Sequence, residues 1–326
     1  MNEKADSRPQ ALVSFVVPMF NEVENIEALV DRIQALQSQI GSRGFKVELV
    51  AVDDGSSDGT ADVLMKALEA SGGLQATVGE LARNFGSHRA VTAGLDLAAG
   101  DCAIVLGADL QEPPQLVDQF LDAWQAGSDV VWGVRQTRSQ GGLATFVSRV
   151  FSRLFHRFSE IKTYPAEGPS GVLISRSVLD RLKELPERNR NVYGLIAWLG
   201  FPSVEVRYDQ RPRHAGVTKW TRIGLARLAV DSFVEFSSAP LKAATMAGLV
   251  TATLGFAYAI FIAARALLVG TAPEGWTTVT VLVLVIGGVQ LLMIGIVGEY
   301  LWRTTDEARR RPVYVLQSVK RLDRVD

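Results

Sequence analysis

Two oxygen-bearing side chains follow a short apolar run in the middle of the chain. The run 102–106 is too short for a helix and is bounded by turn residues, which predicts a buried strand. Asp109 and Gln111 come just after it, and Pro113 and Pro114 then favour the start of a helix. Magnesium and manganese ions prefer such oxygen ligands and take few from the protein when substrate phosphates supply the rest. Taken alone, this pattern favours a simple turn that begins at Asp109, and a divalent-cation site at Asp109 and Gln111 is the alternative.

A second polar loop follows another predicted strand, 47–52. Its sequence, Asp53-Asp54-Gly55-Ser56-Ser57-Asp58-Gly59-Thr60, offers several side chains that could cap the next helix, although a cap needs only one. Two adjacent carboxylates at a strand end can hydrogen-bond a base and a ribose, and glycine lets the backbone approach them closely. The loop therefore predicts a nucleotide site more readily than a cap.

The loop after the first predicted strand carries Asn21 and Glu22. Asn21 with Glu24 fits a helix-capping pair. Glu22 is not needed for that cap, so it is a candidate for ligand binding.

These loops belong to an alternating series of strands and helices. Strands are predicted at 12–18, 47–52, 76–82, 102–106, 129–134 and 204–208, and helices at 25–39, 60–70, 87–99 and 114–126. The alternation predicts an α/β domain with right-handed crossovers and a mainly parallel sheet, in which 204–208 is an edge strand. Five polar residues follow these strands and would gather at one edge of the sheet, where such sheets bind ligands: Asp53, Asp54, Arg83, Asp109 and Arg135.

Composition limits the possible partners. The chain of 326 residues has 34 lysines and arginines against 35 acidic residues, so no basic field indicates nucleic-acid binding. The single cysteine, Cys102, lies inside an apolar run, which indicates core packing and not a disulfide. Residues 1–10 contain no hydrophobic segment, so we expect a disordered tail and not a signal peptide.

Five motifs stand along the first part of the chain: Pro18-Met-Phe-Asn-Glu22, Val52-Asp-Asp-Gly-Ser-Ser-Asp-Gly-Thr60, Arg83-Asn-Phe-Gly86, Ala93-Gly-Leu-Asp96 and Ala108-Asp-Leu-Gln-Glu-Pro-Pro114. Together they resemble the family 2 glycosyltransferases with the Rossmann-like GT-A fold. More narrowly they resemble the polyprenyl-phosphate glycosyltransferases, the group of bactoprenol glucosyltransferase and dolichol-phosphate mannose synthase. The resemblance implies that a nucleotide sugar binds with Mg²⁺ or Mn²⁺ and that the sugar passes to the phosphate of a membrane lipid.

The resemblance also assigns roles to residues of this chain. It places the metal at Asp109 and Gln111. It places the donor nucleotide at Pro18, Asn21, Glu22, Asp53, Asp54, Gly55, Arg83 and Asp109.

Two segments depart from the family pattern. The family usually has Asp-Ala-Asp where this chain has Gly107-Ala-Asp109, so the first carboxylate is absent. Where the family tends to have Asp-x-Gly-Asp-Phe-Arg-Leu on the acceptor side, this chain has Ala166-Glu-Gly-Pro-Ser-Gly-Val172. Glu167 is the nearby carboxylate that could substitute. A catalytically impaired scaffold that binds the donor is therefore an alternative.

Basic residues form two further candidate sites. The loop Arg211-Pro-Arg-His-Ala-Gly-Val-Thr-Lys219 holds three cations around a glycine and resembles a family loop, so Arg211, Arg213 and Lys219 are predicted to contact the diphosphate. With Asp109, which would hold the metal, they are the predicted catalytic residues. A predicted helix at 143–161 places Arg149, Arg153 and Arg157, at four-residue spacing, on one face. That face is either solvated or, with Arg135, contacts the acceptor phosphate.

The C-terminal third predicts a membrane anchor after a catalytic domain at 11–220. Residues 221–238 have apolar residues at helical spacing, which favours an amphipathic helix on the bilayer surface over a core-facing soluble helix. The apolar segments 243–264 and 278–301, within 239–302, are each near the length needed to span a bilayer, and 303–326 is expected to be a tail. Lys242, Arg303 and Arg309–Arg311 flank the pair, so the positive-inside rule places both termini and the catalytic domain in the cytoplasm, on an integral protein of the inner membrane.

The resemblance implies UDP-glucose or a related UDP-sugar as the donor, undecaprenyl phosphate as the acceptor, and a homo-oligomer. We expect the hexose to be transferred with inversion. One alternative is a mannosyltransferase that uses GDP-mannose. A processive polysaccharide synthase is disfavoured, because such enzymes generally share a Gln-x-x-Arg-Trp motif and this chain lacks it.

Overall fold

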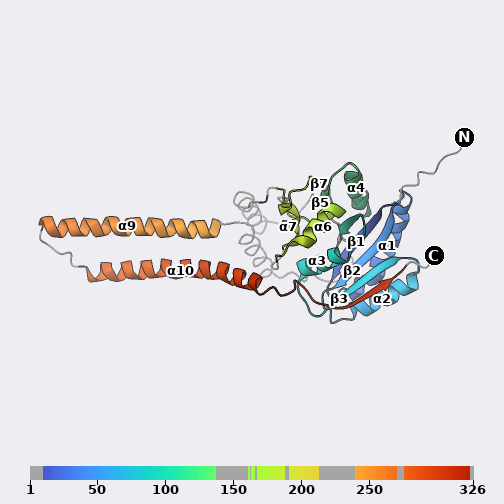
Figure 1. Cartoon of the computed structure of the whole chain (residues 1–326), viewed down its shortest axis with the longest axis horizontal. Helices are drawn as coiled ribbons and strands as arrows, with labels where there is room; N and C mark the ends of the chain where they lie inside the picture. The colour runs from blue at the N-terminus through green and yellow to red at the C-terminus, as the bar shows by residue number, and fades with distance from the viewer. Residues whose placement is uncertain are drawn as a thin grey trace.

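The structure is a computed structural model that describes residues 10–136, 161, 163–165, 167–187, 191–212, 239–269 and 275–323. It consists of an α/β domain and two long helices that lie side by side and extend away from that domain (Figure 1). The last strand of the chain lies in the sheet of the α/β domain, so the two helices form a hairpin that leaves the domain and returns to it.

One eight-stranded sheet organises the domain, in the order β7-β5-β6-β4-β1-β2-β3-β8. Its strands are β1 (Leu12–Met19), β2 (Lys46–Asp53), β3 (Gln75–Leu81), β4 (Cys102–Val105), β5 (Val130–Arg135), β6 (Gly171–Ser175), β7 (Ser203–Tyr208) and β8 (Leu316–Leu322). β6 runs antiparallel to β4 and β5, and β8 runs antiparallel to β3, whereas the other pairings are parallel. The prediction of a mainly parallel α/β sheet is confirmed, as is the edge position of β7.

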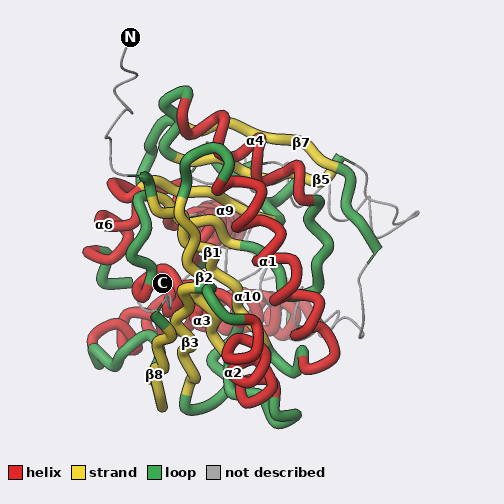
Figure 2. Tube along the Cα trace, turned by 90° about the vertical axis from the view of Figure 1, so that its right-hand side faces the viewer, coloured by secondary structure: helices red, strands yellow, loops and turns green. Residues whose placement is uncertain are grey.

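Helices cover both faces of this sheet (Figure 2). They are the short 3₁₀ helix η1 (Val23–Asn25), α1 (Ile26–Gly41), α2 (Thr60–Ser71), α3 (Ser87–Leu97), α4 (Pro114–Gln125), α6 (Arg176–Glu184) and α7 (Val192–Trp198). Successive strand residues point to opposite faces, so Phe15 packs in one core with α1 and α4 while Val16 packs in the other with α3, α6 and α7. Cys102 is fully buried, which confirms its predicted core role.

A buried polar network holds the turn between α3 and β4 at the amino end of β1. The Glu48 carboxylate is 3% exposed and accepts hydrogen bonds from the Ser14 hydroxyl, the Ala99 N–H (2.7 Å) and the Gly100 N–H (3.1 Å). A side chain at Gly100 would meet the Ser14 Oγ at 2.5 Å. This network is on the opposite edge of the sheet from the loops that carry the predicted site.

The prediction of a tail at 303–326 is wrong for most of its length. The last long helix continues to Ala308, and Leu316–Leu322 forms β8, which pairs with β3 from Leu81 to Ala76. Leu316 packs on Leu81, and the Tyr314 hydroxyl donates to Asp96 Oδ2 at 2.7 Å. The strand has few apolar residues because one face of it is solvated, which is why its sequence pattern was weak.

The two long helices are α9 (Ala239–Val269) and α10 (Trp276–Ala308), both longer than the predicted spans of 243–264 and 278–301. Large apolar side chains point outward from them: Leu254, Phe256, Leu291 and Ile294 are between 65% and 72% exposed. By length and composition, Val285–Ala308 qualifies among the described residues as a membrane span, and Ala244–Tyr258 is apolar but shorter. A helix that is apolar all round requires an apolar environment. The predicted amphipathic helix at 221–238 lies outside the described residues.

Candidate active site

The loop after β1 and the loop after β2 are held together by hydrogen bonds. Asn21, in a left-handed backbone conformation (φ 53°), donates its N–H to Ser56 Oγ (2.8 Å), and its side-chain Oδ1 accepts from the Ser57 N–H (2.9 Å). The predicted capping pair of Asn21 and Glu24 is therefore wrong, because Asn25 takes the N-cap position of α1. The Glu22 carboxylate accepts from Asn25 Nδ2 (2.6 Å) at the same turn.

Asp53 lies at the end of β2 and is 4% exposed. Its carboxylate accepts from the N–H of Ser56 (3.0 Å) and from the Ser56 hydroxyl. Burial raises the pKa of Asp53, against these hydrogen bonds, which lower it. Asp58 accepts from the Thr60 N–H (3.0 Å) at the start of α2, so Asp53 is not needed there.

Asp54 connects the β2 loop to the loop after β3. Its carboxylate oxygens accept from the N–H groups of Phe85 (2.7 Å) and Gly86 (2.9 Å), and burial raises its pKa. These bonds make Asp54 a positioning residue for the Arg83–Gly86 loop, and its predicted contact with the nucleotide stays a prediction. The exposed Arg83 guanidinium lies 4.2 Å from the centre of the Phe85 ring.

Gly55 is where these two loops come closest. Its backbone has φ 69°, and a Cβ built on it would lie 2.5 Å from the carbonyl carbon of Arg83 and 2.7 Å from the N of Asn84. Only glycine fits a left-handed position against another backbone at this distance. The contact between the β2 loop and the β3 loop therefore depends on glycine at this position.

The structure brings the predicted metal loop against the predicted diphosphate loop. The Arg211 N–H donates to the Gln111 carbonyl (2.9 Å), and Gln111 Nε2 donates to the Arg211 carbonyl (3.4 Å), across 100 residues of sequence. The Gln111 amide oxygen accepts from Gln210 Nε2 (2.6 Å), which orients it. Leu110, between Asp109 and Gln111, has φ 60°, so the loop holds a strained backbone at the site. Asp109 and Gln111 are half-buried.

Glu112 is a buried carboxyl group in this loop that the sequence analysis missed. It is 5% exposed and accepts a hydrogen bond from the Gly107 N–H, while Arg32 donates to its backbone carbonyl. Burial and the charge of Asp109 raise the pKa of Glu112 to about 7. Its place in the Asp-Leu-Gln-Glu motif was visible, but nothing in the sequence indicated that a glutamate beside two prolines would be buried.

Arg135, which was predicted to contact the acceptor phosphate, is the last residue of β5 and pairs with Tyr208, the last residue of β7. The Tyr208 hydroxyl and Ser170 Oγ are 2.7 Å apart, Ser170 Oγ also donates to the Gly133 carbonyl (3.1 Å), and Arg135 hydrogen-bonds Tyr208. Ser170 belongs to the segment that departs from the family pattern. Glu167, the expected substitute acid, lies 3.9 Å from Arg207 at the surface.

The described donor set suits a hard divalent cation that shares its ligands with a phosphate. Asp109 offers a carboxylate and Gln111 an oriented amide oxygen, and a Cβ at Gly107 would fall 2.8 Å from Asp109 Oδ1. Within the described ranges no group of three or more His, Cys, Asp or Glu side chains could hold a metal by itself. Mg²⁺ and Mn²⁺ commonly bind through one or two protein groups and substrate phosphates, so the residues fit.

Four predicted site residues fall outside the described residues: Arg149, Arg153, Arg213 and Lys219. Pro18 lies in β1, paired with Val52.

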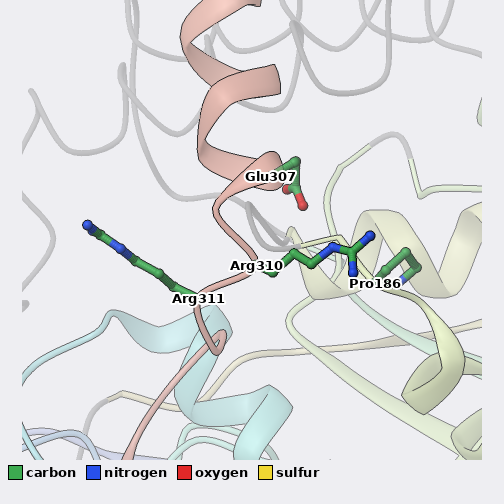
Figure 3. Close-up of a pocket in the computed structure, with 4 residues that line it drawn as sticks. All are labelled: Pro186, Glu307, Arg310 and Arg311. Carbon is green, nitrogen blue, oxygen red and sulfur yellow. The ribbon is translucent and has the colours of Figure 1, made fainter.

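A pocket of about 520 Å³ lies where α10 ends, lined by Pro186, Glu307, Arg310 and Arg311. In Figure 3 the Arg310 side chain points toward Pro186 and passes near Glu307, whereas Arg311 points the opposite way. The two guanidinium groups therefore do not converge on one ligand, and we assign no catalytic role to this pocket.

Comparison with known proteins decides the family. The profile described as Glycosyl transferase family 2 matches residues 14–182, more than half of the chain, and includes the loops after β1 to β4. The chain belongs to glycosyl transferase family 2. Within this family 2 glycosyltransferase, a second profile, the GtrB C-terminal hairpin, matches residues 239–303, which are α9 and most of α10. The predicted GT-A type of sheet is thereby confirmed.

Relatives align with this family 2 glycosyltransferase over almost their whole lengths. A protein named prophage bactoprenol glucosyl transferase homolog from Escherichia coli is 35% identical, covering 95% of this chain and 99% of the relative. The bactoprenol glucosyl transferase of Shigella phage SfV is 35% identical, covering 94% of this chain and 99% of the relative. An uncharacterized glycosyltransferase of Synechocystis is also 35% identical, covering 94% of this chain and 95% of the relative. A solved mannosyltransferase from Pyrobaculum calidifontis, in complex with GDP-Man and Mn²⁺, has a TM-score of 0.48 at 22% identity, covering 91% of this chain and 88% of that chain.

Proposed function

We propose that this glycosyltransferase transfers glucose, or a related hexose, from a UDP-sugar to the phosphate of undecaprenyl phosphate, with inversion at the anomeric carbon. The observation that carries the proposal is a family 2 domain and a GtrB-type hairpin in one chain, which aligns end to end with relatives named bactoprenol glucosyl transferase. The juxtaposition of Gln111 with Arg211 supports it, because the metal and diphosphate loops must meet in such an enzyme.

The path of the chain supports a position at the membrane face. The chain leaves the catalytic domain for α9, returns through α10 and continues into β8, which is hydrogen-bonded to β3. Both ends of the hairpin therefore lie on the side of the catalytic domain. Lys242, Arg303 and Arg309–Arg311 belong to those ends, so the positive-inside rule favours the cytoplasmic side for the domain.

The proposed reaction is a single displacement. The second pKa of a phosphate monoester is about 6, so the acceptor oxygen is already anionic at neutral pH and needs no general base. That oxygen attacks the anomeric carbon, the bond between this carbon and the diphosphate oxygen breaks, and UDP leaves with the electron pair. The demanding part is the negative charge that develops on the diphosphate while the sugar becomes oxocarbenium-like.

We assign the stabilisation of this negative charge to Arg211, with Arg213 and Lys219 of the same loop. We assign the binding of the nucleotide to Glu22, Asp53 and the neighbouring loops. Asp109 and Gln111 would hold Mg²⁺ or Mn²⁺, which supplies further positive charge at the diphosphate when bound. On the acceptor side we assign the lipid phosphate to Arg135, with Arg149 and Arg153. A homo-oligomeric state stays a prediction, because the structure contains one chain.

The test is sugar transfer by the full chain in detergent, using radiolabelled UDP- and GDP-sugars, undecaprenyl phosphate and Mn²⁺. We expect label in the lipid from a UDP-hexose, a loss of at least about 100-fold in Asp109→Asn, and wild-type transfer in the matched control Asp62→Asn, an exposed carboxylate on α2. The anomeric configuration of the product is read by NMR.

Three results would contradict parts of the proposal. Donor binding without transfer would favour the scaffold alternative that the absent acid at Gly107 raised. Transfer from GDP-mannose and from no UDP-sugar would show that the proposed donor is wrong. A product with retained configuration would exclude the single displacement.

A further inference from the structure

The loop between β4 and α4 lacks an acid at position 107 yet contains a buried one at 112. A Cβ built on Gly107 would lie 2.8 Å from Asp109 Oδ1 and 3.5 and 3.6 Å from the two carboxylate oxygens of Glu112. An aspartate at 107 would extend its carboxylate beyond that Cβ, into the space that the Glu112 and Asp109 oxygens now border. A carboxylate at position 107 would therefore lie beside the carboxylate that Glu112 already provides.

The surroundings of Glu112 keep its carboxylate in that space. The side chain is 5% exposed, and the Gly107 N–H donates to the carboxylate across the loop. Arg32 donates to the Glu112 backbone carbonyl, and burial together with the nearby charge of Arg211 lowers the pKa of Arg32. Glu112 thus lies beside Asp109 and Arg32, in the same loop as Gln111.

We propose that Glu112 is the second carboxylate of the divalent-cation site, and that it takes the place of the acid missing at Gly107. The proposal rests on the proposed function, since it concerns the cation that this function uses. Two neighbouring carboxylates repel each other. A divalent cation bound between them attracts both, and this attraction outweighs their repulsion. Hard cations take carboxylate oxygens as ligands, and a carboxylate from position 112 is of the same chemical kind as one from position 107.

The competing role for Glu112 is purely structural, as an acceptor that closes the loop on the Gly107 N–H. The substitution Glu112→Gln separates the two roles, because glutamine keeps an oxygen that can accept this hydrogen bond and loses only the charge. The double variant Gly107→Asp with Glu112→Gln returns a carboxylate to the other side of the same space.

The experiment measures Mn²⁺ affinity of the full chain in detergent with UDP present, from the EPR signal of free Mn²⁺, and records the thermal midpoint of each variant. We expect Glu112→Gln to weaken Mn²⁺ binding at least about tenfold at an unchanged thermal midpoint, and the double variant to recover most of that loss. If Glu112→Gln does not fold, the Mn²⁺ affinity of the folded double variant is compared directly with that of the wild type, and an affinity at least about tenfold weaker would overturn the proposal.

Wild-type Mn²⁺ affinity in Glu112→Gln, or no recovery in a folded double variant, would overturn the proposal. The two proposals fail separately. If the wild type transfers sugar while Glu112→Gln binds Mn²⁺ normally, the role of Glu112 alone is excluded, and if the wild type neither transfers sugar nor binds Mn²⁺ with UDP, both fall.

Discussion

Alanine at Gly55 should damage the proposed nucleotide site much more than alanine at Gly59, although both glycines have left-handed backbones in the same loop. Gly59 has φ 84° and no atom within 4 Å of its built Cβ, so Gly59→Ala incurs only the backbone strain, about 1 kcal/mol. At Gly55 the Cβ lies 2.5 Å from the Arg83 carbonyl carbon, where ordinary contact begins at 3.4 Å, so the Arg83–Asn84 backbone must retreat by about 0.9 Å.

That displacement has two measurable consequences. Overpacking adds about 1–3 kcal/mol to the strain, so we expect Gly55→Ala to lower the free energy of unfolding by about 2–4 kcal/mol. The retreating segment is the loop that Asp54 holds through Phe85 and Gly86. A shift of this size in a binding loop costs up to about 100-fold, so we expect UDP affinity to fall at least about tenfold.

The assay is UDP binding by isothermal titration calorimetry, with thermal unfolding in the same detergent. Gly59→Ala serves as the matched control, and we expect it to keep UDP affinity within about threefold, a change below 1 kcal/mol. Equal UDP affinity and equal thermal midpoints in the two variants would refute the reasoning, because they would show that the loops do not depend on their contact at Gly55.

Three further predictions concern stability. Glu48→Ala should lower the free energy of unfolding by about 3 kcal/mol or more, because it leaves buried N–H and O–H donors without their acceptor. Glu48→Gln keeps an acceptor and should lower it by less, so equal thermal midpoints of the two variants would contradict this prediction. His88 has a buried Nδ1 without a hydrogen-bond partner among the described residues, and burial lowers its pKa from 6.5 to about 4. The unfolded chain therefore binds the proton more readily, so stability falls as the pH drops from 6.5 to about 4, by at most about 3 kcal/mol; thermal midpoints of His88→Gln should lose this contribution, and an identical pH profile would exclude it. Tyr314→Phe removes the hydrogen bond to Asp96 and should cost about 1 kcal/mol, seen as a lower thermal midpoint, whereas no change would show that this bond does not help hold the segment before β8.

Local pattern was enough to predict most of the catalytic domain. The strand at Cys102–Val105 and the helix at Pro114–Gln125 were predicted because apolar periodicity and prolines act over a few neighbouring residues. The positions of Asp53 and Asp109 after parallel strands followed from the same pattern, since the carboxyl ends of parallel strands lie at one edge of a sheet. The family motifs are short and contiguous, so they too were readable in the sequence.

Contacts between distant segments were decided only by the tertiary structure. Asp54 accepts hydrogen bonds from residues 31 and 32 positions away, and Gln111 pairs with Arg211 across 100 positions. β8 joins the sheet by pairing with β3, which comes much earlier in the chain. The side chains of Lys320 in β8 and Glu80 in β3, 240 positions apart, are hydrogen-bonded. Such pairings depend on strand order and on which backbone groups remain to be satisfied, and neither is encoded in local periodicity.

The site itself divides in the same way. The sequence by itself determined which residue types stand at the ends of the strands, and so the chemistry available there. Only the folded chain decided that Asp54 holds a loop, that Glu167 lies at the surface and that Glu112 is buried beside Asp109. The physical reason is that burial and hydrogen-bond partners are properties of the packed chain, whereas residue type and spacing belong to the sequence.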